Sequence, residues 1–168
     1  MIVLVASMIA IGSLLLAPER GLLIRFGRIA YFRYVCLCEN VLKILWKNNS
    51  TGVTSLKMIK KYQKISSFYL RFILGRMRDQ GWIEKRGDED FALTSEGKQR
   101  ASKIVRFHRL WEVYLANYLG FGVEKVHRNA EEIEHIMTPE LEEELTVLLK
   151  NPKRDPHEQI IPPREPAL

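Results

Sequence analysis

The chain has 168 residues, a formal net charge of +6 and a sequence pI near 9.4, which suit one domain, or one small domain with appended segments. This balance is compatible with nucleic acid or an anionic membrane as a partner. Two cysteines, Cys36 and Cys38, are too few for a disulfide framework, which excludes the small disulfide-stabilised domains and favours a reducing compartment.

The N-terminal segment is apolar over residues 2–17, apart from Ser7, Gly12 and Ser13. It is shorter than the roughly 20 apolar residues that a bilayer span needs, and it has no preceding positive charge as in a signal peptide. Arginines follow it at positions 20, 25, 28 and 33, and such an excess marks the cytoplasmic side. We therefore expect a membrane segment over residues 1–17 with its C-terminal end inside, the last span of a longer protein. The alternative is an apolar helix packed within a soluble protein.

The next segment, residues 21–38, mixes aromatic residues with arginines, which is typical of a connector in the lipid headgroup layer. We expect Cys36 and Cys38 within it to be ordinary reduced cysteines. Residues 1–38 are thus interpreted as a membrane segment with a basic juxtamembrane connector.

Residues 39–100 show the element order of a winged helix-turn-helix. A short buried helix is expected over 39–47, a turn over 48–52, and a helix to about residue 62 capped by Thr54 or Ser55. A second helix over 68–80 is capped by Ser66 or Ser67, and strands over 82–86 and 91–94 enclose a turn at 87–90.

The charge of this part supports DNA binding. Residues 43–86 hold eleven Lys or Arg against Asp79 and Glu84, a net charge of +9, which suits the phosphates of a duplex. The alternative is an ordinary solvated charged face. The second helix has an apolar stripe, and we expect its N-terminal end to enter the major groove. The stripe is Leu70, Ile73, Leu74 and Met77, and the residues expected to contact DNA are Ser66, Ser67, Tyr69, Arg71, Arg76, Lys85 and Arg86.

Histidine and glutamate recur at helical spacing in the C-terminal half. Helices are expected over residues 95–119, 123–137 and 138–150, before an irregular tail. Residues four apart share a helix face, and imidazole with carboxylate suits a divalent Mn, Fe, Co, Ni or Zn ion. The alternative is a solvated acidic face, because residues 131–144 hold seven Glu and no Lys or Arg. The candidate metal ligands are His108 and Glu112, then His127, Glu131, Glu134 and His135.

These motifs resemble the DtxR/MntR family of iron- and manganese-dependent repressors over residues 39–163. The resemblance is carried by Ala-Leu-Thr-Ser-Glu-Gly at 92–97, His-Arg-Leu-Trp-Glu at 108–112, Lys-Val-His at 125–127, Ala-Glu-Glu-Ile-Glu-His-Ile-Met at 130–137 and Asp-Pro-His-Glu-Gln-Ile-Ile-Pro at 155–162. It implies an ancillary metal site at His108, Glu112 and His127, and a primary site at Glu131, Glu134 and His135.

The same resemblance implies that the ion is Mn²⁺ or Fe²⁺. Glu131 stands where iron-type members use Cys, and a hard oxygen ligand favours manganese. Asn40 aligns with the Asp or Met ligand of the family's first helix. Lys43 is a departure, since it stands where manganese-type members can place a second carboxylate.

A separate resemblance covers the N-terminus. The run Leu-Leu-Leu-Ala-Pro-Glu-Arg-Gly-Leu-Leu at 14–23 resembles the end of the last membrane helix of a metal-ion ABC transporter permease. Together the two resemblances imply a permease–repressor fusion.

The expected fold is mainly α, with a membrane helix, a winged helix-turn-helix at 39–100, all-helical metal-binding and dimerisation helices at 101–152, and an irregular tail at 153–168.

The expected function is a homodimeric, metal-dependent repressor of metal uptake that binds operator DNA. It would be a cytoplasmic domain anchored by residues 1–17 unless cleaved, with the rest of a permease and its ATPase as possible partners. The alternative is a membrane-bound metal sensor of a permease that does not bind DNA. No His-Glu-x-x-His motif is present, and we do not expect an enzyme.

Overall fold

The computed structural model describes residues 1–17, 21–48, 52–63 and 65–164. Several expectations fall outside these residues: the motif residues 18–20, the centre of the turn at 49–51, Lys64 and the end of the tail at 165–168. The chain forms two compact units, Met1–Leu37 and Cys38–Leu168.

The first unit is helical. It contains α1 (Ile2–Leu16) and the first part of α2 (Leu22–Lys47). The structure does not support the expected membrane helix over residues 1–17: α1 has 15 residues, and among the described residues no helix is both long and apolar enough to cross a bilayer.

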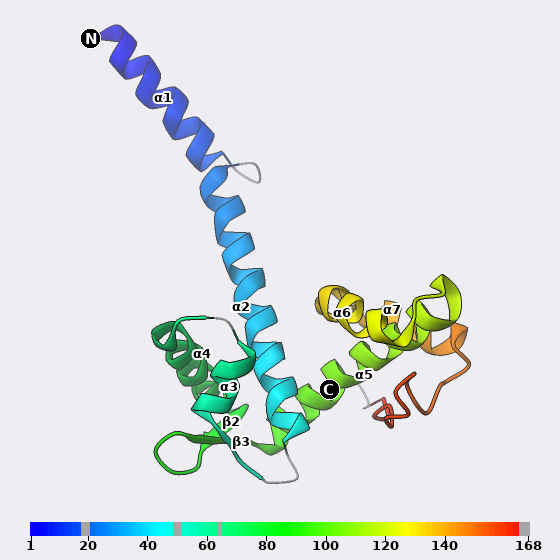
Figure 1. Ribbon diagram of the computed structural model, residues 1–168. Coiled ribbons are helices and arrows are strands. Elements are labelled where there is room, and N and C mark those ends of the chain that lie inside the picture. The colour runs from blue at the N-terminus through cyan, green and yellow to red at the C-terminus, as the bar shows by residue number, and fades with distance from the viewer. Residues whose placement is uncertain (18–20, 49–51, 64, 165–168) are drawn as a thin grey trace. The chain divides into compact units, whose positions relative to one another are not determined.

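The expected connector and the expected short helix at 39–47 are one continuous helix, α2 (Figure 1). Its 26 residues contain no proline, and Gly27 is its single glycine, so nothing in its sequence breaks the helix. The division between the two compact units, after Leu37, also falls inside α2.

The second unit begins with the winged head. Its elements are β1 (Thr54–Ser55), α3 (Leu56–Tyr62), α4 (Ser67–Asp79), β2 (Ile83–Lys85) and β3 (Asp90–Leu93) (Figure 1). The strands form an antiparallel sheet in the order β1-β3-β2, with Thr54 opposite Phe91 and Ile83 opposite Leu93. The two helices and the hairpin occur as expected, whereas the two-residue strand β1 is too short to give a sequence pattern.

Serine caps set the starts of both head helices. The Ser55 hydroxyl accepts a hydrogen bond from the Met58 amide in α3, and the Ser66 hydroxyl accepts one from the Tyr69 amide in α4. The apolar stripe expected on α4 is confirmed, because all four of its residues are buried. They belong to a core that includes Val41, Leu42, Leu45, Ile59, Leu70, Ile73, Leu74, Met77 and Ile83.

The C-terminal half of the second unit contains α5 (Ser95–Leu119), α6 (Val123–Ile133), the 3₁₀ helix η2 (Glu134–Ile136) and α7 (Pro139–Leu148) (Figure 1). Gly120, with a φ of 66°, ends α5 in the left-handed region. The helix expected over 123–137 ends earlier, at Ile133. Glu134 and His135 therefore lie on a 3₁₀ turn instead of continuing the face of α6.

The tail is more ordered than expected up to residue 164. Arg154 forms a β-bridge with Ile160, and the Asp155 carboxylate accepts hydrogen bonds from the amides of His157 and Gln159, at 2.8 and 2.9 Å. This loop has a fixed shape because a buried aspartate organises its backbone.

We predict opposite effects for alanine at two helical glycines. A Cβ at Gly97 would lie 1.8 Å from the Trp82 carbonyl oxygen, whereas a Cβ at Gly75 has no atom within 4 Å. Gly97→Ala should therefore lower the free energy of unfolding by about 1–3 kcal/mol or more. Gly75→Ala should raise it by roughly 0.5–1 kcal/mol, because alanine has the higher helix propensity. Urea unfolding followed by circular dichroism measures both, and equal effects would contradict the packing of α5 against the Trp82 carbonyl.

Candidate metal centre

Three side chains from two helices meet at one point. His108 and Glu112 lie one turn apart on α5, and His127 lies on α6. The Glu112 Oε1 atom is 3.1 Å from His108 Nε2 and 2.9 Å from His127 Nδ1, and these two nitrogens are 2.8 Å apart. Two imidazole nitrogens and one carboxylate oxygen therefore face one another as a possible metal-ligand set.

The cluster opens onto a cavity of about 340 Å³. His108 and Glu112 are buried, whereas the His127 side chain is 57 % exposed. Lys43 and Trp46 of α2 line the cavity, as does His157 from the tail loop, whose Nε2 atom lies 3.7 Å from Glu112 Oε1. The cavity leaves room on one side of the three donors for water or a further ligand.

The electrostatics of the cluster favour a cation. Burial by itself would raise the pKa of Glu112, but hydrogen bonds and charges from His108 and His127 outweigh it and lower this pKa to about 2. Burial and Lys43 act to lower the pKa of His108, but its contacts with Glu112 and Glu134 outweigh them and raise it. The raised pKa of His108 means that an ion bound through this imidazole competes with a proton.

The other three candidate ligands contact side chains of the protein. Glu134 has a fully buried side chain, with one oxygen 2.5 Å from His108 Nδ1 and the other 2.5 Å from Lys43 Nζ. His135 Nδ1 lies 2.5 Å from Glu39 Oε2, and Glu131 Oε1 lies 3.9 Å from Lys43 Nζ. The structure therefore does not place these three as a separate open cluster.

The contacts from α2 to these ligands come from Glu39 and Lys43, and the assignment of Asn40 as a ligand stays a prediction. Within the described residues Asn40 makes no recorded hydrogen bond or ion pair with the candidate ligands, whereas its neighbour Glu39 contacts His135. Glu39 and Lys43 are four residues apart and so share one face of α2. This spacing could have indicated both contacts from the sequence, but Asn40 was the residue expected to act as a ligand.

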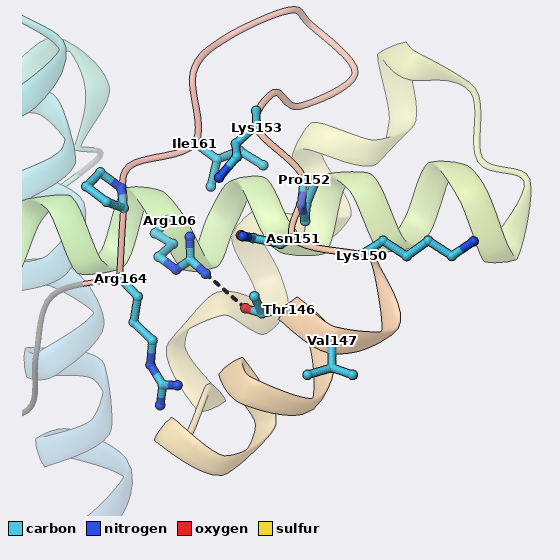
Figure 2. A pocket seen from close by; sticks show the side chains of 10 residues that line it. Arg106, Thr146, Val147, Lys150, Asn151, Pro152, Lys153, Ile161 and Arg164 are labelled. Carbon is cyan, nitrogen blue, oxygen red and sulfur yellow. Dashed lines mark hydrogen bonds between the residues drawn. The ribbon is translucent and has the colours of Figure 1, made fainter.

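A second buried charge network is structural. Arg106 Nε donates to Glu142 at 2.7 Å, and another of its nitrogens donates to the Pro162 carbonyl at 2.9 Å. A further nitrogen donates to Thr146 Oγ1, also at 2.9 Å (Figure 2). These bonds join α5, α7 and the tail. The adjoining cavity of about 620 Å³ is lined by Arg106 and further Lys and Arg residues, without carboxylate or imidazole, so it offers no comparable set of metal ligands.

The expected DNA-contacting residues lie on α4 and the hairpin. Ser66 is exposed at the cap, Ser67 accepts a hydrogen bond from Lys60 at 2.6 Å, and Tyr69 stacks on Phe72. Arg76 and Lys85 are exposed. The remaining two are exposed residues with acidic neighbours: Arg71 pairs with Glu89 at 3.3 Å, and Arg86 with Glu84 at 2.5 Å.

Two aromatic residues of α4 were missed by the sequence reasoning. Phe68 is 86 % exposed and Phe72 is 52 % exposed. They are one turn apart and lie opposite the buried stripe, with Arg71 and Arg76 on either side of their face. An outward position was predictable from helical spacing once the stripe had been assigned.

Comparison with known proteins shows which families this chain is similar to. Residues 94–163 match the family described as "Iron dependent repressor, metal binding and dimerisation domain". The "Diphtheria toxin repressor" of Corynebacterium diphtheriae is 30% identical over 125 residues, covering 74% of this chain and 55% of that protein. The structure titled "Manganese-dependent transcriptional repressor complex with manganese" has a TM-score of 0.70 and 31% identity, covering 75% of this chain and 58% of that one.

A longer match includes the N-terminal unit. The "Probable metal transport system membrane protein" of Chlamydia trachomatis is 32% identical over 171 residues. The match covers 98% of this chain and 38% of that protein, so the chain spans well under half the length of this relative.

These relatives agree with two expectations. Repressors are not enzymes, and relatives of this chain are named as iron-dependent and manganese-dependent repressors, with manganese, zinc and cadmium present in solved structures. The expectation of Mn²⁺ or Fe²⁺ agrees with these names. The fold is that of these repressors: mainly helical, with a small sheet. The chain is thus similar to the iron- and manganese-dependent repressors, and its residues 94–163 match the model of their metal-binding and dimerisation domain.

Proposed function

We propose that the chain is a DNA-binding repressor that responds to Mn²⁺ or Fe²⁺ and controls metal uptake. The observation that carries the proposal is the meeting of His108, Glu112 and His127 in the same unit as a basic winged head. The similarity to metal-dependent repressors supports the combination.

A divalent ion held by these three residues would supply the charge that joins α5 to α6. The chain's own residues couple this point to the head, because α2 lines the same cavity through Lys43 and Trp46. α2 also contributes Val41, Leu42 and Leu45 to the core. Ion binding then favours one arrangement of α2 against α5 and α6, and the population shifts toward the arrangement that reads DNA.

DNA recognition would use the exposed face of α4. In the unbound protein Arg71 pairs with Glu89, but an exposed pair is worth only about 0–1 kcal/mol. Arg71 can therefore exchange Glu89 for a guanine edge or a phosphate at a small cost in free energy. Phe68 and Phe72 suit contact with thymine methyl groups, and Lys85 and Arg86 suit the phosphate backbone at the wing.

A homodimer would place two such heads on one duplex. Large apolar side chains are exposed at the end of α5 and on α7, and the Tyr118 hydroxyl bonds to the Leu148 carbonyl between them. Burial of these side chains against a second copy would stabilise a dimer. They are Tyr118, Leu119, Phe121, Val147 and Leu148.

A second function is favoured by the relatives named as membrane proteins, which match 98% and 96% of this chain. In it, the chain is the end of a metal permease, and its metal-sensing unit remains at the membrane beside the permease and its ATPase. A repressor that acts on the chromosome requires instead a fraction that is released from the membrane. Fractionation of cells expressing the full-length protein separates the two, since the sensor alone stays wholly in the membrane fraction.

For the metal site, we predict that Glu112→Gln weakens Mn²⁺ binding at least about tenfold, because even residues outside the ligand set commonly contribute roughly that factor. His127→Ala should do the same. Glu144→Gln, the same change at an exposed position of α7, should bind like the wild type. Equilibrium dialysis of the full chain against Mn²⁺ measures this, and wild-type affinity in Glu112→Gln would rule out the three-residue site.

For DNA, duplexes selected from a random library with Mn²⁺ provide the probe, and fluorescence anisotropy measures affinity. Arg71→Ala and Arg76→Ala should each weaken binding to the selected duplex by about 1–3 kcal/mol. Lys85→Ala should weaken binding to all duplexes and lower the slope of affinity against salt by about one.

Arg154→Ala is the matched control, because Arg154 is also exposed and ion-paired, with Glu158. Wild-type affinity in both variants of α4 would contradict its role. A selection without any preferred duplex, with or without Mn²⁺, would favour the membrane-bound sensor.

A further inference from the structure

A lysine ammonium group lies where the resemblance implies a primary metal ion. Lys43 Nζ is 2.5 Å from Glu134 Oε1 and 3.9 Å from Glu131 Oε1, and its side chain is only 15 % exposed. Two of the three ligands implied for that site, Glu131 and Glu134, thus lie beside a cation of the chain itself, Lys43.

The third implied ligand contacts the same helix through one of its two ring nitrogens, while the other, Nε2, lies 3.8 Å from Glu134 Oε1. His135 Nδ1 lies 2.5 Å from Glu39 Oε2, and the His135 side chain is almost completely buried. Both contacts come from the same face of α2, one helical turn apart, and both reach η2. The α2 face and the η2 turn are therefore complementary in charge without an added ion.

A divalent ion and this ammonium group cannot share the site. Both would need Glu134 Oε1, an oxygen of a side chain with no exposed surface that already lies 2.5 Å from Lys43 Nζ. A protonated lysine has no lone pair to offer a metal. At such separations in a partly buried site, two positive charges also repel each other strongly.

The His108, Glu112 and His127 cluster does not have this obstacle. Its donors face a cavity, and the buried Glu112 carboxylate is held by imidazoles, which are themselves ligands. Lys43 lines that cavity but forms its recorded ion pairs with Glu131 and Glu134.

We infer that Lys43 is a built-in cation that replaces the primary metal ion, so that each chain binds one divalent ion, at His108, Glu112 and His127. Lys43 and Glu39 then bind α2 to η2 without an ion at that position, and the single ion acts on α2 through His108, which contacts both Glu112 and Glu134. The inference deepens the proposed function and rests on its metal site. Its test involves no DNA, so failure of DNA binding leaves the result intact.

The experiment is the stoichiometry of Mn²⁺ binding to the full chain, by equilibrium dialysis with metal analysis of each compartment. The wild type should bind one ion per chain with a single-site isotherm. Lys43→Met removes the ammonium group and keeps an unbranched side chain only one atom shorter, and should bind two ions per chain. Lys47→Met is the matched control, because Lys47 lies one turn further along α2 and lines the same cavity, and it should still bind one.

Two further variants locate the single ion of the wild type. Glu134→Gln should keep one ion, because Glu134 is a partner of Lys43 in this account, whereas Glu112→Gln should lose it. These two measurements decide the question even if Lys43→Met does not fold.

Three results would overturn the inference: two ions bound to the wild type, which would mean that Lys43 moves aside; one ion bound to a folded Lys43→Met; or loss of the ion in a folded Glu134→Gln.

Discussion

The buried carboxylate of Glu134 is the constraint on which the rest of the C-terminal unit depends. A carboxylate with no exposed surface is stable only if opposite charges and hydrogen bonds replace its hydration. Lys43 and His108 provide them at 2.5 Å each. Removal of one partner from such a buried pair costs about 3–5 kcal/mol, so the elements that carry the partners, α2 and α5, are fixed relative to η2.

From Glu134 the network continues to the proposed ion site. His108 contacts Glu134 through one ring nitrogen, and Glu112 and His127 through the other. The same imidazole therefore belongs both to the contact that holds α2 and to the ligand set on α5 and α6. A change of charge or position in the ligand set therefore reaches α2 through the His108 side chain. This gives a physical route from metal occupancy to the winged head, since α2 also forms part of the core.

Local signals explain which parts of the fold were predictable. The serine caps of α3 and α4, the four-residue stripe of α4 and the spacing of His108 with Glu112 all act within one or two helical turns. Each was therefore readable from the sequence, and the element order of the winged head followed. The meeting of His108, Glu112 and His127 also follows from spacing, once α5 and α6 pack together.

What the sequence did not reveal depends on contacts between distant segments. β1 is two residues long and exists because it pairs with β3. The change from α6 to a 3₁₀ turn at Glu134 is accompanied by contacts from Lys43 and Glu39, about ninety residues away. The choice of Glu39 over Asn40 depends on the rotation of α2, which an alignment of one short helix does not determine. The continuity of α2 was missed because the composition of residues 21–38 was interpreted as a boundary.

The central claim is that the chain binds one divalent ion, at His108, Glu112 and His127, and that the Lys43 ammonium group takes the place of a second one. Anomalous X-ray diffraction from crystals of the full chain grown with Mn²⁺ tests it most directly, because manganese atoms are located individually. We expect one anomalous peak per chain, bounded by His108, Glu112 and His127, with Lys43 still paired to Glu134. A peak between Glu131, Glu134 and His135, with Lys43 displaced, would contradict it.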